Sequence, residues 1–204
     1  MIMTEKYDNF IWDFDGTLFD SYPHTAAALA QALRDSGREI DVKEGEKLLR
    51  ITVGTAVRHY GLNEQERAAF NKYELTDELE PVIKIYDGVE AAFNRILDRG
   101  GKHFLFTHRD KKALEILGKH GMLGLFTEVI TVENGFPYKP APDAIEYLVK
   151  EHSLDKDKTV MIGDREIDIG SGVNAGVHTL FFDEFSVSPK TQAEEIYTSF
   201  EQIG

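Results

Sequence analysis

Two aspartates, Asp13 and Asp15, are separated by one residue and follow an apolar run at residues 10–12. If the strand continues to residue 14, side-chain alternation places both carboxylates on the same side, and Gly16 then lets the backbone turn. Two unit charges about 4 Å apart repel by roughly 4 kcal/mol at an effective dielectric near 20, so the pair needs a cation, a proton or solvent. The spacing therefore predicts either an active site that handles charge or an Asp-Gly turn carrying an additional acid.

Further polar residues follow other short apolar runs of the chain. Thr107 follows the run at residues 102–106, and Asp164 follows the run at 159–162 and a glycine. Lys139 opens a Lys-Pro-Ala-Pro turn, and Asp168 lies four residues beyond Asp164. The carboxyl ends of parallel strands share one edge of a sheet, so these residues are expected to meet there. Together they offer oxygen ligands for a hard divalent cation and a hydroxyl and an ammonium for a phosphoryl group.

Each of these residues also has a purely structural interpretation. Thr107 is a candidate helix cap, with Asp110 as a rival for the same role. Lys139 alone is typical of a solvated turn. Asp168, in the first turn of a predicted helix, would also favour the helix dipole.

The elements that must position these residues fall into two groups. Helical periodicity and capping signals predict a helix from Ser21 to Gly37, and no strand is expected from there to about residue 85. The helices expected in that region are 44–49, 55–60 and one from the capping box Asn63–Glu66 toward Leu79. Beyond residue 85, short apolar runs alternate with helical patterns. The expected strands are 102–106, 129–132, 159–162 and 178–182, and the expected helices are 89–98, 111–120, 143–152 and 167–175. This alternation predicts an α/β fold with a parallel sheet and right-handed crossovers.

Composition narrows the class of protein. The chain has 204 residues, 42% of them hydrophobic, a formal net charge of -13 and a sequence pI near 5.0. This acidic balance argues against a nucleic-acid partner or an anionic membrane surface. We find no signal peptide and no apolar run long enough to span a membrane. The absence of cysteine excludes disulfides and thiolate sites and agrees with a cytoplasmic location.

The motifs resemble those of the haloacid dehalogenase-like (HAD) hydrolase superfamily, specifically its phosphoglycolate-phosphatase-like branch. The matching stretches occur in the order of that family and cover nearly the whole chain: residues 13–21, residues 104–107, residues 139–142, and Gly163-Asp164 with Asp168. The resemblance implies a Rossmann-like parallel-sheet core formed by residues 1–20 and 86–204. It also implies an inserted all-helical cap domain formed by residues 21–85. This domain begins at Ser21, the residue that follows Asp20.

The resemblance also implies roles for individual residues. Asp13 is then the nucleophile that forms an aspartyl-phosphate, and Asp15 is the general acid and base, whose pKa the nearby Asp13 charge would raise. Mg²⁺ is then held by the carboxylates of Asp13 and Asp164 and by the backbone carbonyl of Asp15, and Asp168 orients these ligands. The phosphoryl group is then bound by three further residues, Thr107, His108 and Lys139.

Two positions depart from the family pattern. His108 and Arg109 follow Thr107 where relatives often have Asn or Ser, so the backbone donor remains but a side-chain role is open. Arg165 replaces a small residue after Asp164, and it either reaches the mouth of the pocket or pairs with Glu166.

The predicted cap offers a candidate specificity segment. Gly54 is expected to interrupt two helices and Arg50 to bind a substrate carboxylate or phosphate, although a plain helix–helix turn with a surface arginine explains the same residues. The other histidines are interpreted as structural.

We therefore expect a Mg²⁺-dependent phosphatase that hydrolyses a small phosphomonoester, phosphoglycolate-like or a sugar phosphate. Asp15 argues against dehalogenation, which in this superfamily lacks the second acid. A phosphosugar mutase of the same superfamily is the alternative, and a non-catalytic phosphate-sensing module is a further one. The expected partner is a small phosphorylated metabolite, and the expected assembly is a monomer or homodimer.

Overall fold

The chain folds into two compact units in the computed structural model, which describes residues 4–76, 79, 83–184 and 191–203. The first unit comprises Met1–Leu18 and Tyr86–Gly204, and the second comprises Phe19–Ile85. The boundaries predicted from the sequence follow residues 20 and 85, so the first differs by two residues from the division in the structure.

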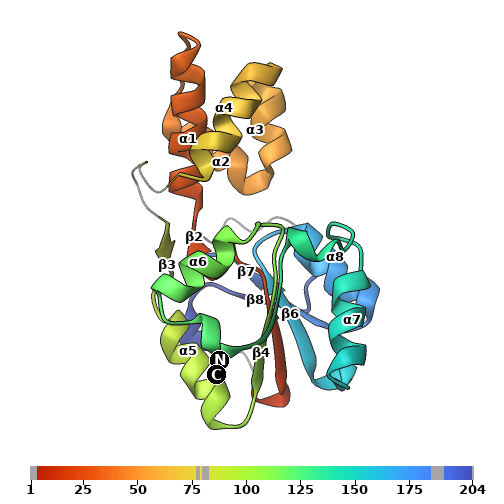
Figure 1. Cartoon of the computed structure of the whole chain (residues 1–204). Coiled ribbons are helices and arrows are strands. Elements are labelled where there is room, and N and C mark those ends of the chain that lie inside the picture. The colour runs from red at the N-terminus through yellow and green to blue at the C-terminus, as the bar shows by residue number, and fades with distance from the viewer. Residues whose placement is uncertain (1–3, 77–78, 80–82, 185–190, 204) are drawn as a thin grey trace. The chain divides into compact units, whose positions relative to one another are not determined.

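A sheet of six parallel strands forms the centre of the first unit (Figure 1). In spatial order the strands are β5 (Phe126–Ile130), β4 (Lys102–Phe106), β1 (Asn9–Trp12), β6 (Thr159–Gly163), β7 (His178–Phe182) and β8 (Glu195–Tyr197). The strand order runs outward in both directions from β1, so the carboxyl ends of β1, β4 and β6 meet where such sheets bind ligands. The predicted α/β fold class and parallel sheet are confirmed.

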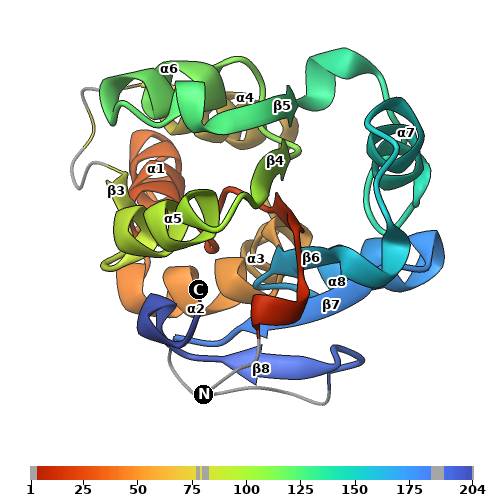
Figure 2. The ribbon, with the colours of Figure 1, turned by 90° about the horizontal axis from the view of Figure 1, so that it is seen from below.

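Helices cover both faces of this sheet (Figures 1 and 2). Helices α5 (Val89–Asp98) and α6 (Lys112–Lys119) lie on one face, and α7 (Asp143–Glu151) and α8 (Glu166–Ala175) lie on the other. Five short 3-10 helices complete the described part of the unit: η1 (Thr4–Lys6), η2 (Leu123–Leu125), η3 (Val132–Asn134), η4 (Lys156–Lys158) and η5 (Phe200–Gln202).

The central strand β1 is buried on both faces, and this fixes the position of the residue that follows it. Trp12 stacks on Phe93 of α5, with ring centroids 5.1 Å apart. Ile11 packs on the opposite face in a cluster with Ile145 and Leu148 of α7. A strand covered on both faces is apolar throughout and does not alternate, as residues 10–12 show. Apolar packing on two sides therefore holds β1 in place and presents Asp13 at its end.

Two strand predictions for this unit were wrong. The strand expected at 129–132 is Phe126–Ile130, because Thr131 leaves the sheet to cap η3, where its hydroxyl accepts a hydrogen bond from the backbone N–H of Glu133. The edge strand β8 was not predicted, since three residues are too few to show a period.

The described residues of the second unit form four helices and a two-stranded antiparallel ribbon. The helices are α1 (Tyr22–Asp35), α2 (Val42–Ile51), α3 (Val53–Tyr60) and α4 (Glu64–Glu74). The ribbon pairs β2 (Phe19–Asp20) with β3 (Lys84–Ile85), which brings the two ends of the unit together. The expectation of no strand before residue 85 was wrong, because strands of two residues carry no detectable alternation.

The helix ends in this unit follow the chemistry of their caps. The capping box of Asn63 and Glu66 is present, but α4 ends at Glu74 and does not reach Leu79 as expected; residues 77–78 of the expected extension lie outside the described residues. The break between α2 and α3 lies at Thr52, which is extended and whose hydroxyl accepts a hydrogen bond from the backbone N–H of Thr55. The predicted break at Gly54 was wrong, since Gly54 lies inside α3. No helix among the described residues has the length and apolar character needed to cross a membrane.

Candidate active site

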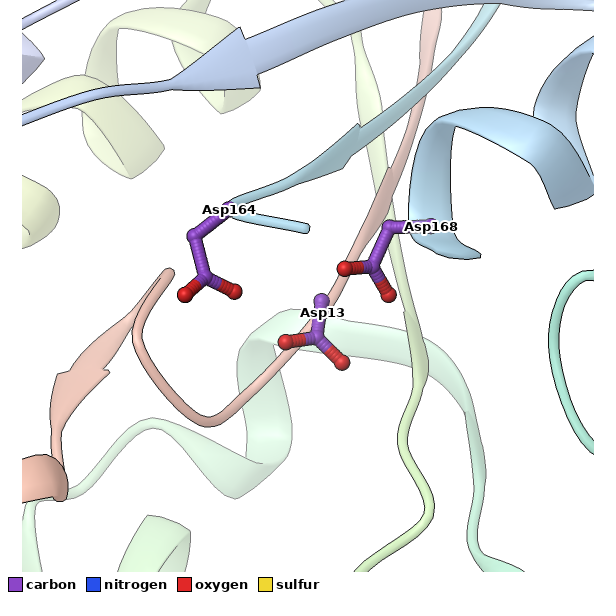
Figure 3. A group of neighbouring side chains, drawn as sticks. All are labelled: Asp13, Asp164 and Asp168. Atoms are coloured by element: carbon purple, nitrogen blue, oxygen red, sulfur yellow. The ribbon is translucent and has the colours of Figure 1, made fainter. Parts of the chain in front are cut away.

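Three carboxylates meet at the carboxyl edge of the sheet. Asp13 follows β1, Asp164 follows the neighbouring strand β6, and Asp168 lies in the first turn of α8; Figure 3 shows the three side chains pointing toward one another. The backbone N–H of Asp13 donates to the carbonyl of Ile162 at 2.8 Å, so parallel pairing aligns the two strand ends. One oxygen from each carboxylate lies within 4.8 Å of the others. The sequence-predicted convergence of these three acids is present.

The ammonium of Lys139 lies between two of these carboxylates. Lys139 Nζ is 2.6 Å from Asp13 Oδ1 and 2.7 Å from Asp168 Oδ1, and the lysine side chain has no exposed surface. It also lies 4.6 Å from the centre of the Phe106 ring. The interpretation of Lys139 as a solvated turn lysine is therefore wrong, because its charge is buried and neutralised by two acids.

Burial and charge act against each other in this cluster. Desolvation raises the pKa of Asp13 to about 6, with a further upward contribution from Asp168, while Lys139 lowers it. Burial by itself lowers the pKa of Lys139, but the two carboxylates outweigh it and raise that pKa. The lysine therefore stays charged, and its ammonium pairs with both carboxylates.

The other oxygen of Asp13 faces a different set of groups. Thr17 Oγ1 lies 3.5 Å from Asp13 Oδ2 and 3.4 Å from Asp164 Oδ1, and Thr17 is fully buried. The Asp13 carboxylate thus contacts the ammonium of Lys139 through Oδ1 and faces Thr17 through Oδ2. Thr17 in turn contacts Asp164. Sequence reasoning did not single out Thr17, although it lies in the first motif, because a threonine after a glycine is common in turns.

Asp168 contacts both the site and the start of α8. Its Oδ1 accepts from Lys139, and its Oδ2 accepts from the backbone N–H of Arg165 at 3.1 Å, which caps the start of α8. A Cβ on Gly163 would lie 2.2 Å from Asp168 Cβ, so the helix begins against a position that only glycine can occupy without displacement. The side chain of Asp168 therefore both caps α8 and contributes to the site.

Asp15 is paired with a second, separate cation. Arg109 Nη2 lies 2.6 Å from Asp15 Oδ1, and Arg109 Nε lies 3.0 Å from Asp15 Oδ2. The sequence predicted repulsion between Asp13 and Asp15 that a cation, a proton or solvent must relieve, and the structure gives each acid its own cation, Lys139 for Asp13 and Arg109 for Asp15. Arg109 was named only as a departure from the family pattern. The signal that could have identified Arg109 in the sequence is a cationic residue in the loop that follows β4.

The loop after β4 also holds Thr107 and His108. Thr107 Oγ1 accepts from the backbone N–H of Arg109 at 3.0 Å, which shapes the turn, and its own O–H proton can still be donated. Asp110 accepts from the backbone N–H of Lys112 at the start of α6, the capping role for which Thr107 was a candidate. His108 Nε2 accepts from the backbone N–H of Lys139 at 2.9 Å. The predicted phosphate-binding loop thus makes direct contact with the Lys139 turn.

The remaining candidates divide between the two units. Arg165 Nε lies 3.9 Å from both Asp164 Oδ1 and Asp168 Oδ2, so its guanidinium adjoins the acids of the site. Arg50 and Gly54 belong to the helical unit. Arg50 Nη2 is 2.8 Å from Glu46 Oε1 and 3.5 Å from Asp20 Oδ1 within that unit. These contacts favour the structural interpretation of Arg50.

Comparison with known proteins agrees with this geometry. The family model described as haloacid dehalogenase-like hydrolase matches residues 10–182, a range that contains every acid of the site and Lys139. The chain belongs to the haloacid dehalogenase-like hydrolase family. The predicted superfamily and the predicted hydrolase class are confirmed.

Individual relatives of this HAD-like hydrolase cover most of its length. The phosphoglycolate phosphatase of Aliivibrio fischeri is 27% identical over 201 residues, which span 87% of this chain and 84% of the relative. The crystal structure of a hydrolase from Streptococcus pneumoniae TIGR4 has 32% sequence identity and a TM-score of 0.66, and the match covers 85% of this chain and 91% of that one. A HAD-superfamily hydrolase from Geobacter sulfurreducens shares the fold, with a TM-score of 0.75 at 19% identity over 97% of this chain and 94% of its own.

Proposed function

We propose that this HAD-like hydrolase is a Mg²⁺-dependent phosphatase that hydrolyses a small phosphomonoester through an aspartyl-phosphate on Asp13. The observation that carries the proposal is the two-sided environment of the Asp13 carboxylate. Its Oδ1 contacts the buried ammonium of Lys139, and its Oδ2 faces the hydroxyl of Thr17, which also contacts Asp164. A nucleophilic carboxylate that also binds a metal needs such a division, because one oxygen must react while the other is held.

The residues present fit a hard divalent cation. Carboxylate oxygens of Asp13, Asp164 and Asp168 lie within 4.8 Å of one another, and oxygen is the ligand atom that Mg²⁺ prefers. Both oxygens of Asp168 accept hydrogen bonds, from Lys139 Nζ and from the backbone N–H of Arg165, whereas Asp13 contacts Lys139 through Oδ1 alone. We therefore assign the metal to the carboxylates of Asp13 and Asp164 and the backbone carbonyl of Asp15. When bound, Mg²⁺ supplies charge neutralisation and polarisation of a phosphoryl oxygen.

In the first step, a carboxylate oxygen of Asp13 attacks phosphorus and the bond to the ester oxygen breaks. The departing oxygen takes a proton from Asp15, which leaves an alcohol and an aspartyl-phosphate. Lys139 and the hydroxyl of Thr107 stabilise the negative charge on the transferred phosphoryl oxygens. The fixed ammonium therefore acts at the point where charge accumulates.

In the second step, Asp15 takes a proton from water while the water oxygen attacks phosphorus, which releases phosphate and restores the Asp13 carboxylate. Arg109 stabilises the ionised form of Asp15 that this step requires. The first step requires Asp15 to carry a proton, so the pair with Arg109 must loosen before it. Arg109 therefore makes Asp15 a stronger acid in the first step and, in the second, holds its carboxylate in place to take a proton from water.

The substrate assignment rests on the relatives. The similarity to phosphoglycolate phosphatases supports a small, carboxylated or sugar-like phosphomonoester, with phosphoglycolate among the candidates. We propose that the helical unit acts as a cap that selects the substrate. Arg50 and Gly54 are not assigned to substrate contact, because Arg50 is paired with Glu46 and Asp20 and Gly54 lies inside α3. A cytoplasmic location and a monomer or homodimer complete the proposal.

The test is phosphate release from a panel of small phosphomonoesters, phosphoglycolate included, with Mg²⁺ and with EDTA. We expect metal-dependent turnover that is lost in Asp13→Asn and in Asp15→Asn. Asp8→Asn, which removes an exposed carboxylate that pairs with Lys158, is the matched control and should retain full activity. An isomerised product without free phosphate would indicate a mutase, and no turnover with any ester in the presence of tight phosphate binding would indicate a phosphate-sensing module.

A further inference from the structure

The segment that carries Lys139 has few hydrogen bonds to the rest of its unit. Residues 135–142 connect η3 to α7 without a helix or strand, and their three prolines have no backbone N–H to donate. Within the segment, the backbone N–H of Ala141 donates to the carbonyl of Tyr138 at 3.0 Å. Asn174 of α8 donates to the carbonyl of Pro140 at 2.9 Å. A chain segment of this kind does not by itself fix a side chain to within a fraction of an ångström.

His108 connects this segment to the end of β4. Its Nε2 accepts from the backbone N–H of Lys139 at 2.9 Å, the same residue whose ammonium contacts Asp13 and Asp168. The imidazole packs edge-to-face against Phe106 of β4, with centroids 5.8 Å apart, and against Tyr138, with centroids 4.6 Å apart. The ring is therefore anchored to the sheet on one side and to the Lys139 segment on the other.

The protonation state of His108 matches this contact. An Nε2 that accepts from an N–H carries a lone pair, so the proton of the neutral ring is on Nδ1. Burial lowers the pKa of His108 to about 4, and the charge of Lys139 adds to this effect. The ring is accordingly neutral at physiological pH and keeps its acceptor.

We propose that His108 is a positioning residue that fixes the ammonium of Lys139 by accepting the hydrogen bond of the Lys139 backbone. The proposal rests on the proposed function, in which Lys139 stabilises the transferred phosphoryl group. The side chain of His108 then acts on Lys139 through Nε2, while its backbone N–H remains the expected donor to the phosphoryl group. The backbone N–H of Lys139 is hydrogen-bonded to the phosphate-binding loop, and its ammonium contacts the nucleophile. The two loops therefore hold each other in place.

Two substitutions distinguish the contribution of the hydrogen-bond acceptor of His108 from that of its aromatic ring. His108→Phe keeps an aromatic ring between Phe106 and Tyr138 but removes the acceptor. His108→Gln loses the ring but places an amide oxygen near the position of Nε2. Because misplacement by about 1 Å can cost on the order of 100-fold in rate, we expect His108→Phe to lower kcat by about 10- to 100-fold with little change in KM. We expect His108→Gln to recover most of that loss.

A double-mutant cycle with Lys139→Met tests whether His108 acts through Lys139. If it does, adding His108→Phe to Lys139→Met lowers kcat by less than about twofold, because the ammonium is already gone. Equal losses in both backgrounds would contradict the proposal, as would a wild-type kcat in His108→Phe. Where Lys139→Met turns over too slowly for kinetics, the same cycle is measured as the affinity for inorganic phosphate in the presence of Mg²⁺.

The controls separate the possible failures. Thermal unfolding midpoints above the assay temperature show that each variant is folded. A wild-type protein that hydrolyses no ester would contradict the proposed function. An active wild type whose His108→Phe variant is equally active would contradict only the positioning role.

Discussion

The guanidinium of Arg109 binds both carboxylate oxygens of Asp15, with Nη2 2.6 Å from Oδ1 and Nε 3.0 Å from Oδ2. The arginine side chain is only 6% exposed. Its backbone is held on both sides, because its N–H donates to Thr107 Oγ1 and its carbonyl accepts from the N–H of Val132 at 3.2 Å. This ion pair is therefore part of the folded loop, and it gives the second acid of the motif a fixed partner.

Arg109→Gln should slow the second half of the reaction. Without the guanidinium, the Asp15 carboxylate loses the two hydrogen bonds that fix its position, so it is less well placed to take a proton from the water that attacks the aspartyl-phosphate. We expect kcat to fall by about tenfold and the phosphorylated enzyme to accumulate, visible as a burst of alcohol before steady state. Lys111→Gln, which removes an exposed cation of the same loop, is the control. A burst-free variant with unchanged kcat would show that Arg109 has no part in this step.

Asp164→Asn should weaken metal binding more than it weakens folding. The amide removes one of the negative charges that share the Asp13 side of the site. We expect the Mg²⁺ concentration for half-maximal activity to rise by at least about tenfold, with activity partly restored at high Mg²⁺. Asp110→Asn, in which asparagine can still cap α6, should leave this concentration unchanged. Identical Mg²⁺ dependence in Asp164→Asn and wild type would remove Asp164 from the proposed ligand set.

Gly163→Ala should impair both stability and turnover. The added Cβ would lie 2.2 Å from Asp168 Cβ and 2.5 Å from its Cγ, so the start of α8 must move. Overpacking of this kind costs about 1–3 kcal/mol. Because Asp168 binds Lys139, the shift should also lower kcat. Gly118→Ala is the matched control, since nothing lies within 4 Å of its added Cβ. Urea unfolding and kcat are the measurements, and a variant with wild-type values of both would refute the close-packing argument.

The first unit should lose stability in mild acid because of His103. This buried ring accepts from Trp12 Nε1 at Nδ1, at 3.0 Å, and its Nε2 contacts the carbonyl of Phe93 at 3.2 Å, so only the neutral ring satisfies both contacts. Burial lowers its pKa from 6.5 to about 4. The unfolded chain therefore binds a proton that the folded chain does not, and the stabilisation present above pH 6.5 is lost as the pH falls toward 4, by about 3 kcal/mol in all.

The emission of Trp12, the single tryptophan of the chain, reports this transition during urea unfolding at a series of pH values. His103→Phe should flatten the dependence on pH between 6.5 and 4, whereas the exposed His59→Gln should not. Equal slopes in wild type and His103→Phe would assign the acid sensitivity to other groups.

Arg50→Ala is expected to leave catalysis unchanged. The guanidinium is already bound by Glu46 and Asp20 and lies over the ring of Tyr22, with Cζ 4.6 Å from the ring centre. We expect KM and kcat for phosphoglycolate and for a neutral phosphomonoester to stay within about twofold of wild type. A KM that rises for the carboxylated ester alone would instead support Arg50 as the residue that reads a substrate carboxylate.

Local sequence patterns predict most of the helices and strands and the polar residues at their ends. Apolar runs that stop at Asp13, Thr107 and Asp164 predict parallel strands whose carboxyl ends meet, because periodicity and topology are properties of local sequence and of chain handedness. The capping box at Asn63 was readable for the same reason. Elements of two or three residues, such as β2, β3 and β8, were not, since they are too short to carry a period.

Which cation pairs with which acid depends on the folded arrangement of the chain. Arg109 is 94 residues from Asp15 in sequence, and Lys139 is 126 residues from Asp13. Such pairs depend on strand register, loop conformation and side-chain rotamers, none of which is encoded by the residues next to either partner. The same holds for His108, whose neighbours in sequence give no sign that its ring accepts from the backbone of Lys139. The motifs therefore named the acids of the site, and packing assigned their partners.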